Sequence, residues 1–309
     1  MDDHPASTES DPAHTPFVTR YRRTQLVVAI ASVLCFMMFW CAGNFLHILS
    51  PRGFEASILR QRYWPLDILA IYVLLGAAVA IGTVVAGRWW FFAGLFAAGI
   101  GLMALSIRGG PMRYVLFESA TDGSPRAVFL SLAIEQCLLF LPLALTWVFF
   151  SRRYAAALPP LETADDKKES TGSLPMTLLM QFVATGALLL LLAPTDAKKQ
   201  VLVGVFVACF GGAALAESIV PDRKAAAWFW VSPLAVGVLG YVLAFVNATD
   251  FTTGTAAGMF AKLAHPLPLD YASAGIAGAL LGYWSGAERP ELSTSILASM
   301  TPKREPNSG

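Results

Sequence analysis

The chain has 309 residues, of which 56% are hydrophobic and only 14% are charged, and its mean hydropathy is +0.58. Soluble domains carry charge on about a quarter of their residues, so this composition excludes an ordinary soluble protein and places the chain in a lipid bilayer. The formal net charge of +1 provides no basic field that would attract nucleic acid, and we expect no nucleic-acid partner.

Residues 1–24 are polar, rich in Asp, Ser, Thr and Pro, and end in a cluster of arginines. Such a segment cannot bury enough apolar surface to fold, so we expect a disordered tail. The apolar segment 25–48 follows, and it exceeds the roughly 20 residues that cross a hydrocarbon core. We interpret it as an uncleaved first span, because a secretory signal would combine a basic start with a shorter apolar core.

Seven further apolar segments are expected to be transmembrane helices: 66–86, 89–107, 128–150, 174–192, 201–219, 226–246 and 269–286. A turn at Gly87 must separate the second span from the third, since one helix over both would be about 60 Å long, twice the apolar thickness. The polar linker 151–173 divides the chain into membrane halves 25–150 and 174–286, and residues 287–309 form a second disordered tail. The sequence therefore predicts an all-α polytopic membrane bundle of about eight helices in four hairpins.

Basic residues indicate the orientation of the bundle. Arg22, Arg23, Arg152 and Arg153 flank the first and fourth spans directly, and the positive-inside rule places such clusters in the cytoplasm. An even number of spans then puts both termini on the cytoplasmic side. We expect an integral protein of a bacterial cytoplasmic membrane.

Two parts of the chain resemble each other. The third span opens with Trp89-Trp90 and the seventh contains Trp228 and Trp230, while Pro65-Leu66-Asp67 recurs as Pro268-Leu269-Asp270. The matching spans run in the same direction, so a duplication would be a parallel four-plus-four repeat. Chance resemblance between apolar hairpins is an equally good explanation.

Small residues and outer loops suggest how the helices pack. Pairs four residues apart, such as Gly94 with Ala98 and Gly278 with Gly282, predict close helix contacts, either inside the bundle or at a dimer face. The outer loop segments 54–60, 110–116 and 258–263 mix apolar and basic residues and are expected to lie on the outer membrane interface.

Polar side chains inside apolar segments are costly and usually face an interior. Five of them form our candidate intramembrane polar site: Asn44, Glu135, Gln136, Gln181 and Asn247. Residues at the outer helix ends and loops form a candidate outer vestibule: His47, Arg52, Arg60, Arg62, Asp67, Arg108, Arg113, His265 and Asp270. Asp67 and Asp270 also lie at helix N-termini, where a carboxylate can cap the helix and complement its dipole.

Glu135 is where we expect a single functional centre, because the similar hairpin 228–284 has no equivalent acid. The structural alternative is that Glu135 bonds a neighbouring helix or pairs with a loop arginine and only holds hairpins together. Asn44, Gln136 and Gln181 can likewise act as hydrogen-bonded links between helices.

Catalytic templates are missing from the sequence, which contains no HExxH, no GxSxG and no histidine box, and we predict no catalytic residues. The four cysteines are isolated within apolar runs, so we expect no metal and no cofactor.

Three functions stay open. The first is a transporter or channel in which Glu135, Gln136 and Asn44 line an outward-facing site for a small or anionic solute or a lipid headgroup. Paired Gly/Pro interruptions, which mark the broken helices of many transporters, are not found at matching positions. The second is a non-catalytic structural or assembly subunit of a membrane complex, and the third is a lipid-headgroup enzyme. The expected partners are membrane lipids and either further copies of the chain or partner subunits.

Overall fold

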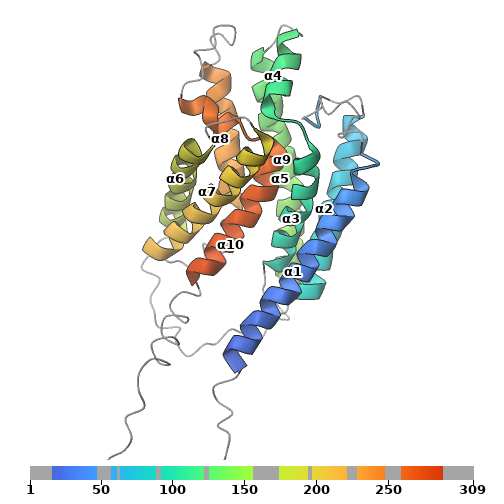
Figure 1. Ribbon diagram of the computed structural model, residues 1–309, viewed down its shortest axis with the longest axis vertical. Helices are drawn as coiled ribbons and strands as arrows, with labels where there is room; N and C mark the ends of the chain where they lie inside the picture. Colours follow the sequence, from blue (N-terminus) through green and yellow to red (C-terminus); the bar gives the residue numbers. More distant parts are fainter. Residues whose placement is uncertain are drawn as a thin grey trace, which may run out of the picture.

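A computed structural model describes residues 16–46, 57–60, 63–87, 92–121, 125–155, 174–193, 197–220, 228–247 and 259–287. All regular structure in these ranges is helical (Figure 1). The helices are α1 (Pro16–Ala42), α2 (Trp64–Ala86), α3 (Ala93–Arg108), α4 (Met112–Thr121), α5 (Pro125–Ala155), α6 (Leu174–Leu192), α7 (Lys198–Ile219), α8 (Val231–Asn247), the 3-10 helix η3 (Met259–Ala264), α9 (Pro268–Asp270), the π-helix η4 (Tyr271–Gly275) and α10 (Ile276–Ala287).

Five helices in the described ranges are long and apolar enough to cross a membrane: Arg23–Ala42, Trp64–Ala86, Ala127–Phe149, Leu174–Leu192 and Lys198–Ile219. Large apolar side chains such as Leu26, Val73 and Leu191 are exposed on their outer faces, as expected where lipid replaces water. The expected number of eight spans is not confirmed, because α3 and α8 are shorter apolar helices of 16 and 17 residues.

The boundary of the N-terminal tail is wrong by part of a helix. α1 begins at Pro16, within the segment 1–24 that we expected to be disordered. Arginine has a high helix propensity, so the arginines before the apolar run extend the helix rather than end it. The rest of that tail, nearly all of the linker 151–173 and the C-terminal tail from residue 288 lie outside the described residues.

Helix α3 packs against α1 and α2, α7 packs against α6 and α10, and α5 packs against α8. The start of α1 and the end of α10 lie at the same end of the bundle, which we call the inner end, while α4 lies at the outer end (Figure 1). The four-plus-four repeat is not confirmed. Under that repeat α8 would correspond to α3, but it packs mainly on α5 rather than on the two helices preceding it.

Glycines make the closest helix contacts, as the spacing of small residues predicts. A Cβ atom on Gly278 or Gly282 of α10 would overlap the carbonyl oxygens of Phe206 and Phe210 on α7. A Cβ on Gly82 of α2 would lie 2.8 Å from the Cα atom of Gly94 on α3. These contacts join helices of one chain, so the predicted seams inside the bundle are confirmed.

The last helix of the C-terminal hairpin is continuous from Pro268 to Ala287 and contains a π-helical turn near its start. Every residue from Leu267 to Leu280 is buried, and the backbone passes from α9 through η4 into α10. The segment 258–263 was expected on the outer membrane interface. Within the described part of it Leu263 is buried, and the adjacent Ala264 is buried as well, so this end of η3 packs against the bundle. The carbonyl of Leu263 accepts a 2.6 Å hydrogen bond from the Tyr271 hydroxyl, which holds η3 against the bundle.

Candidate functional site

Glu135 lies on α5 and is the centre of the first cluster. Its carboxyl group is 1% exposed, and Oε2 accepts three hydrogen bonds from the turn 57–60. The donors are Ser57 Oγ at 2.6 Å, Ile58 N at 2.9 Å and Leu59 N at 3.3 Å. Hydrogen bonds to an ionised oxygen are about twice as strong as neutral ones. Glu135 therefore fastens an outer turn to the fourth apolar segment.

The two oxygens of Glu135 differ. Oε1 is buried and has no hydrogen-bond partner in the part of the chain that the structure describes. Because Oε2 is already occupied by three donors, Oε1 is the position at which a proton can bind without displacing any of them. A carboxylate that only joined two parts of the protein would have hydrogen bonds to both of its oxygens, whereas in the described ranges Glu135 has them to Oε2 alone.

Asp270 is the centre of a second cluster and is completely buried. Its Oδ1 atom accepts a hydrogen bond from Ser106 Oγ on α3 and lies 2.6 Å from Lys198 Nζ on α7. Its Oδ2 atom accepts a 2.9 Å bond from the N–H of Leu267, so Asp270 caps the short helix α9 as its position predicts. The carboxylate thus ties α3 and α7 to the first turn of the last helix.

Tyr241 on α8 is completely buried and contacts the segment that carries Asp270, and α9 packs against α5, which carries Glu135. The hydroxyl donates a 2.5 Å hydrogen bond to the carbonyl of Pro266, and its ring packs edge-on against Tyr271 at 6.4 Å between centroids. We define the outer polar centre as Ser57, Ser106, Glu135, Lys198, Tyr241 and Asp270. These residues come from α3, α5, α7, α8, α9 and the turn 57–60.

Four members of the outer polar centre, Ser57, Ser106, Lys198 and Tyr241, were not among the candidate residues that the sequence indicated. Lys198 was assigned to an outer loop, but it is the first residue of α7 and its side chain is only 12% exposed. The sequence does contain a hint of the Lys198–Asp270 pair. A carboxylate at the start of a span, such as Asp270, needs a nearby cation, and Lys198 begins a span at the same end of the bundle. Ser106 and Tyr241 carry no sequence signal, because Ser and Tyr are common in membrane helices.

Arg108 and Asn44 bond each other rather than a member of this centre. Arg108 Nη2 donates to Asn44 Oδ1 at 2.9 Å, and Nη1 donates to the carbonyl of Trp40 at 2.8 Å. The guanidinium carbon lies 5.1 Å from the centroid of the Trp40 ring. Arg108 therefore holds the end of α1. Because its guanidinium group already bonds Trp40 and Asn44, it is not positioned as a binding group for an anionic solute.

Gln136 and Gln181 have different roles from Glu135. Gln181 Nε2 on α6 donates a 2.8 Å bond to the carbonyl of Phe229, which is the link between helices that the structural alternative predicts. Gln136 is adjacent to Glu135 on α5, so it points about 100° away around the helix. It lines a groove between α5, α6 and α8 instead.

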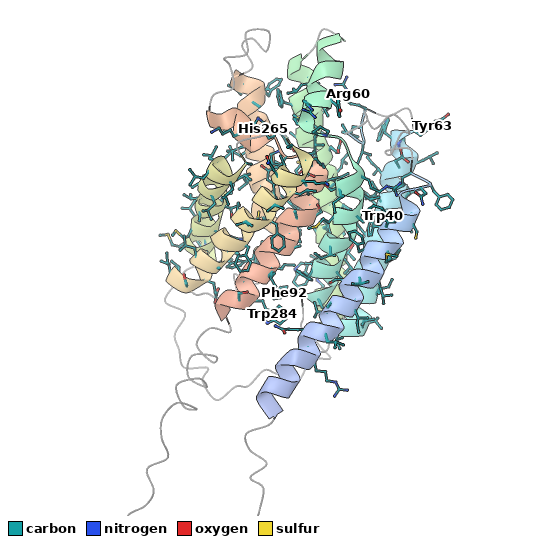
Figure 2. The ribbon with its side chains drawn as sticks, viewed as in Figure 1. Trp40, Arg60, Tyr63, Phe92, His265 and Trp284 are labelled. Carbon is teal, nitrogen blue, oxygen red and sulfur yellow. The ribbon has the colours of Figure 1, made fainter. Side chains whose placement is uncertain are left out.

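The remaining vestibule candidates are dispersed. Asp67 is buried in the first turn of α2, and Arg113 is exposed with its guanidinium carbon 5.6 Å from the Tyr114 ring centroid. Arg60 and His265 are half-buried near the outer end, opposite Phe92 and Trp284 near the inner end (Figure 2). His47, Arg52, Arg62 and the side chain of Asn247 lie outside the described residues.

In the described ranges, no three His, Cys, Asp or Glu side chains come together to hold a metal ion. The cysteines Cys35 and Cys209 are buried, Cys41 and Cys137 are exposed, and all four are free thiols.

Comparison with known proteins gives no match to any family model, and no match among curated proteins or solved structures. The geometry of the outer polar centre therefore carries the functional argument.

Proposed function

We propose that this multi-pass membrane protein is a proton-coupled transporter of a small solute, with Glu135 as the group that binds the proton. The observation that carries the proposal is the asymmetry of its carboxylate, in which Oε2 holds the turn 57–60 and Oε1 is buried without a partner among the described residues. Ionisable groups inside membrane spans are costly and usually mark ion or substrate pathways.

The contacts of Glu135 suggest how proton binding would move the protein. While Glu135 is ionised, its charge strengthens the bonds to Ser57, Ile58 and Leu59. A proton on Oε1 removes that charge, so the same three bonds weaken and the turn is released. The turn 57–60 then acts as an outer gate that is closed when Glu135 is charged.

The cluster around Asp270 supports the same function. Asp270 lies in the first turn of the last helix, immediately before its π-helical turn. Short π-helical turns also occur frequently at functional sites. Two carboxylates and one ammonium group favour a proton or small cation over an anion, while Arg108 is already bonded to α1.

Transport is tested in proteoliposomes that contain a trapped pH-sensitive dye. A potassium diffusion potential, negative inside, should drive proton uptake by the unsubstituted protein above that of empty liposomes, and Glu135→Gln should abolish it. Glu217→Gln, which changes an acid at the other end of α7, is the control and should retain uptake. Proton uptake at the same rate in Glu135→Gln, or no uptake above empty liposomes by the unsubstituted protein, would overturn the proposal.

The gate is tested separately with Leu59→Cys and a membrane-impermeant maleimide, using the unsubstituted chain as background for its own cysteines. Acidification should increase labelling of Cys at position 59, and the added substitution Glu135→Gln should make labelling high at every pH. Labelling that is independent of both pH and Glu135 would show that the turn is not a gate.

A structural or assembly subunit is the second candidate function. It is favoured by the number of polar residues that join two elements, namely Glu135, Asp270, Arg108 and Gln181. Under this alternative Glu135→Gln lowers the recovery of a partner subunit, and proton uptake stays at the level of empty liposomes in the unsubstituted protein as well.

A further inference from the structure

The ammonium group of Lys198 is a cation held by oxygen atoms of two other helices. Its Nζ atom lies 2.6 Å from Asp270 Oδ1, and the same oxygen accepts a hydrogen bond from Ser106 Oγ on α3. Asp270 and Ser106 are both completely buried. The place for a positive charge is therefore formed by α3 and the last helix, and α7 supplies only the charge that occupies it.

The ammonium group has a way out of this site at the outer end of the bundle. The Lys198 side chain is 12% exposed, and Lys198 is the first residue of α7. Its Nζ atom is also close to the end of α3, since a Cβ atom added to the half-buried Gly109 would lie 3.8 Å from it. Because lysine carries its charge on a flexible four-carbon stem, the ammonium can turn from Asp270 toward outer water without a movement of the helices.

Charge restricts what can take the place of the ammonium. A buried carboxylate without a cationic partner is strongly destabilising, so neither an anion nor a neutral solute can replace Lys198 at Asp270. The replacing ion should carry one charge, because Asp270 is a single carboxylate and Ser106 is neutral. Carboxylate and hydroxyl oxygens are ligands for hard cations, and an ion no larger than an ammonium group needs only the space that Lys198 vacates.

We propose that Asp270 and Ser106 form a binding site for a small monovalent cation of the alkali-metal class, such as Na⁺. The ion enters from the outer end, binds Asp270 Oδ1 and Ser106 Oγ, and replaces the Lys198 ammonium, which turns into outer water. The buried carboxylate thus always has one positive partner. As a binding site this inference depends on the Asp270 cluster alone, whereas the role of the ion as the solute exchanged for protons rests on the proposed function.

Reductive methylation of lysine measures the exchange directly. The full-length protein in detergent is treated with formaldehyde and a borane reductant in NaCl or in N-methylglucamine chloride of equal ionic strength, and the peptide that begins at Ala197 is analysed by mass spectrometry. Na⁺ binds only the form in which Lys198 is released, so it should raise the methylation rate of Lys198 at least about fivefold and in a saturable manner. The adjacent Lys199 is exposed and should be methylated at the same rate in both salts.

Three substitutions assign the effect to this site. Asp270→Asn removes the carboxylate that both cations need, so methylation of Lys198 should be fast in both salts. Ser106→Ala retains the ion pair and removes one ligand oxygen, so half of the maximal effect should require about tenfold more Na⁺. Glu217→Gln, which changes an acid near the other end of α7, is the control and should retain the full response to Na⁺.

Equal methylation of Lys198 in NaCl and N-methylglucamine chloride would overturn the proposal, and so would an equally large effect of CaCl₂ at the same ionic strength. If Asp270→Asn does not fold, the comparison of salts and the shift in Ser106→Ala decide the question. Proton uptake that depends on Glu135, without any effect of Na⁺ on Lys198, would refute the cation site and leave the transport function standing. An effect of Na⁺ on Lys198 without proton uptake would establish the site and refute proton coupling.

Discussion

Lys198 Nζ lies 2.6 Å from Asp270 Oδ1, so a lysine at the start of α7 and an aspartate in the first turn of the last helix form an ion pair within the bundle. Asp270 is completely buried, whereas the Lys198 side chain is 12% exposed. A buried charge without its partner is strongly destabilising. Removing Lys198, the partner of the more deeply buried charge, should therefore lower the stability more than removing Asp270.

Lys198→Met should therefore destabilise the protein by about 3 to 5 kcal/mol, because it leaves Asp270 unpaired. Asp270→Asn should cost less, since Lys198 can turn toward the outer surface. The double substitution Lys198→Met with Asp270→Asn should recover part of the loss. Reversible unfolding in mixed detergent measures all three, and equal losses in the two single variants would contradict the difference in burial.

Glu135→Gln should destabilise the protein by about 1 to 3 kcal/mol, because it removes the charge that strengthens three hydrogen bonds. Ser57→Ala removes one of these bonds and should cost about 1 kcal/mol in the unsubstituted background. In the Glu135→Gln background the same change should cost clearly less. A double-mutant cycle tests this, and strictly additive losses would show that Ser57 and Glu135 are not coupled.

Gly282→Ala should destabilise the bundle by about 1 to 3 kcal/mol, because the added Cβ overlaps the Phe210 carbonyl oxygen and pushes α10 from α7. Gly186→Ala on α6 is the matched control. No atom lies within 4 Å of its added Cβ, so the higher helix propensity of alanine should stabilise the protein by up to about 1 kcal/mol. Thermal unfolding should give opposite signs for these two variants.

Arg108→Lys should loosen the end of α1, although the positive charge is retained. Lysine cannot reproduce the two guanidinium bonds to Trp40 and Asn44, and because Arg108 is partly exposed the cost should be only about 1 kcal/mol or less. Hydrogen exchange provides the more sensitive readout, with faster exchange expected at residues 39–44 and unchanged exchange in α6. Unaltered exchange at residues 39–44 would mean that Arg108 does not hold this end of α1.

The long apolar helices follow from the sequence because lipid exposure requires a continuous apolar surface. The predicted segment 174–192 coincides with α6, and the predicted segment 66–86 differs from α2 by two residues at its start. The π-helical turn in the last span could not be predicted, since residues 269–286 contain no internal proline. Gly275, the last residue of that turn, lies so close to Pro233 on α8 that an added Cβ atom would overlap the proline ring.

The candidate site was predictable only in part. Glu135 and Asp270 are costly in an apolar setting, so their position alone drew attention to them. Their partners were not predictable, because two of the donors to Glu135 are backbone N–H groups of a turn that is 76 and 77 positions away in the sequence. Gln136 and Glu135 are neighbours in the chain, and only the rotation of α5 assigns them to different surfaces.

The complete burial of residues 267–280 has a consequence for biosynthesis. The chain is made from its N-terminus, so α3, α5, α7 and α8 are in the membrane before the segment that fills the space between them has been translated. Until then Ser106, Lys198 and the carbonyls of Phe206 and Phe210 lack the partners they have in the finished protein. A nascent chain that stops before Pro268 should therefore be a substrate for membrane proteases, and a complete C-terminal hairpin is required for the protein to persist in the cell.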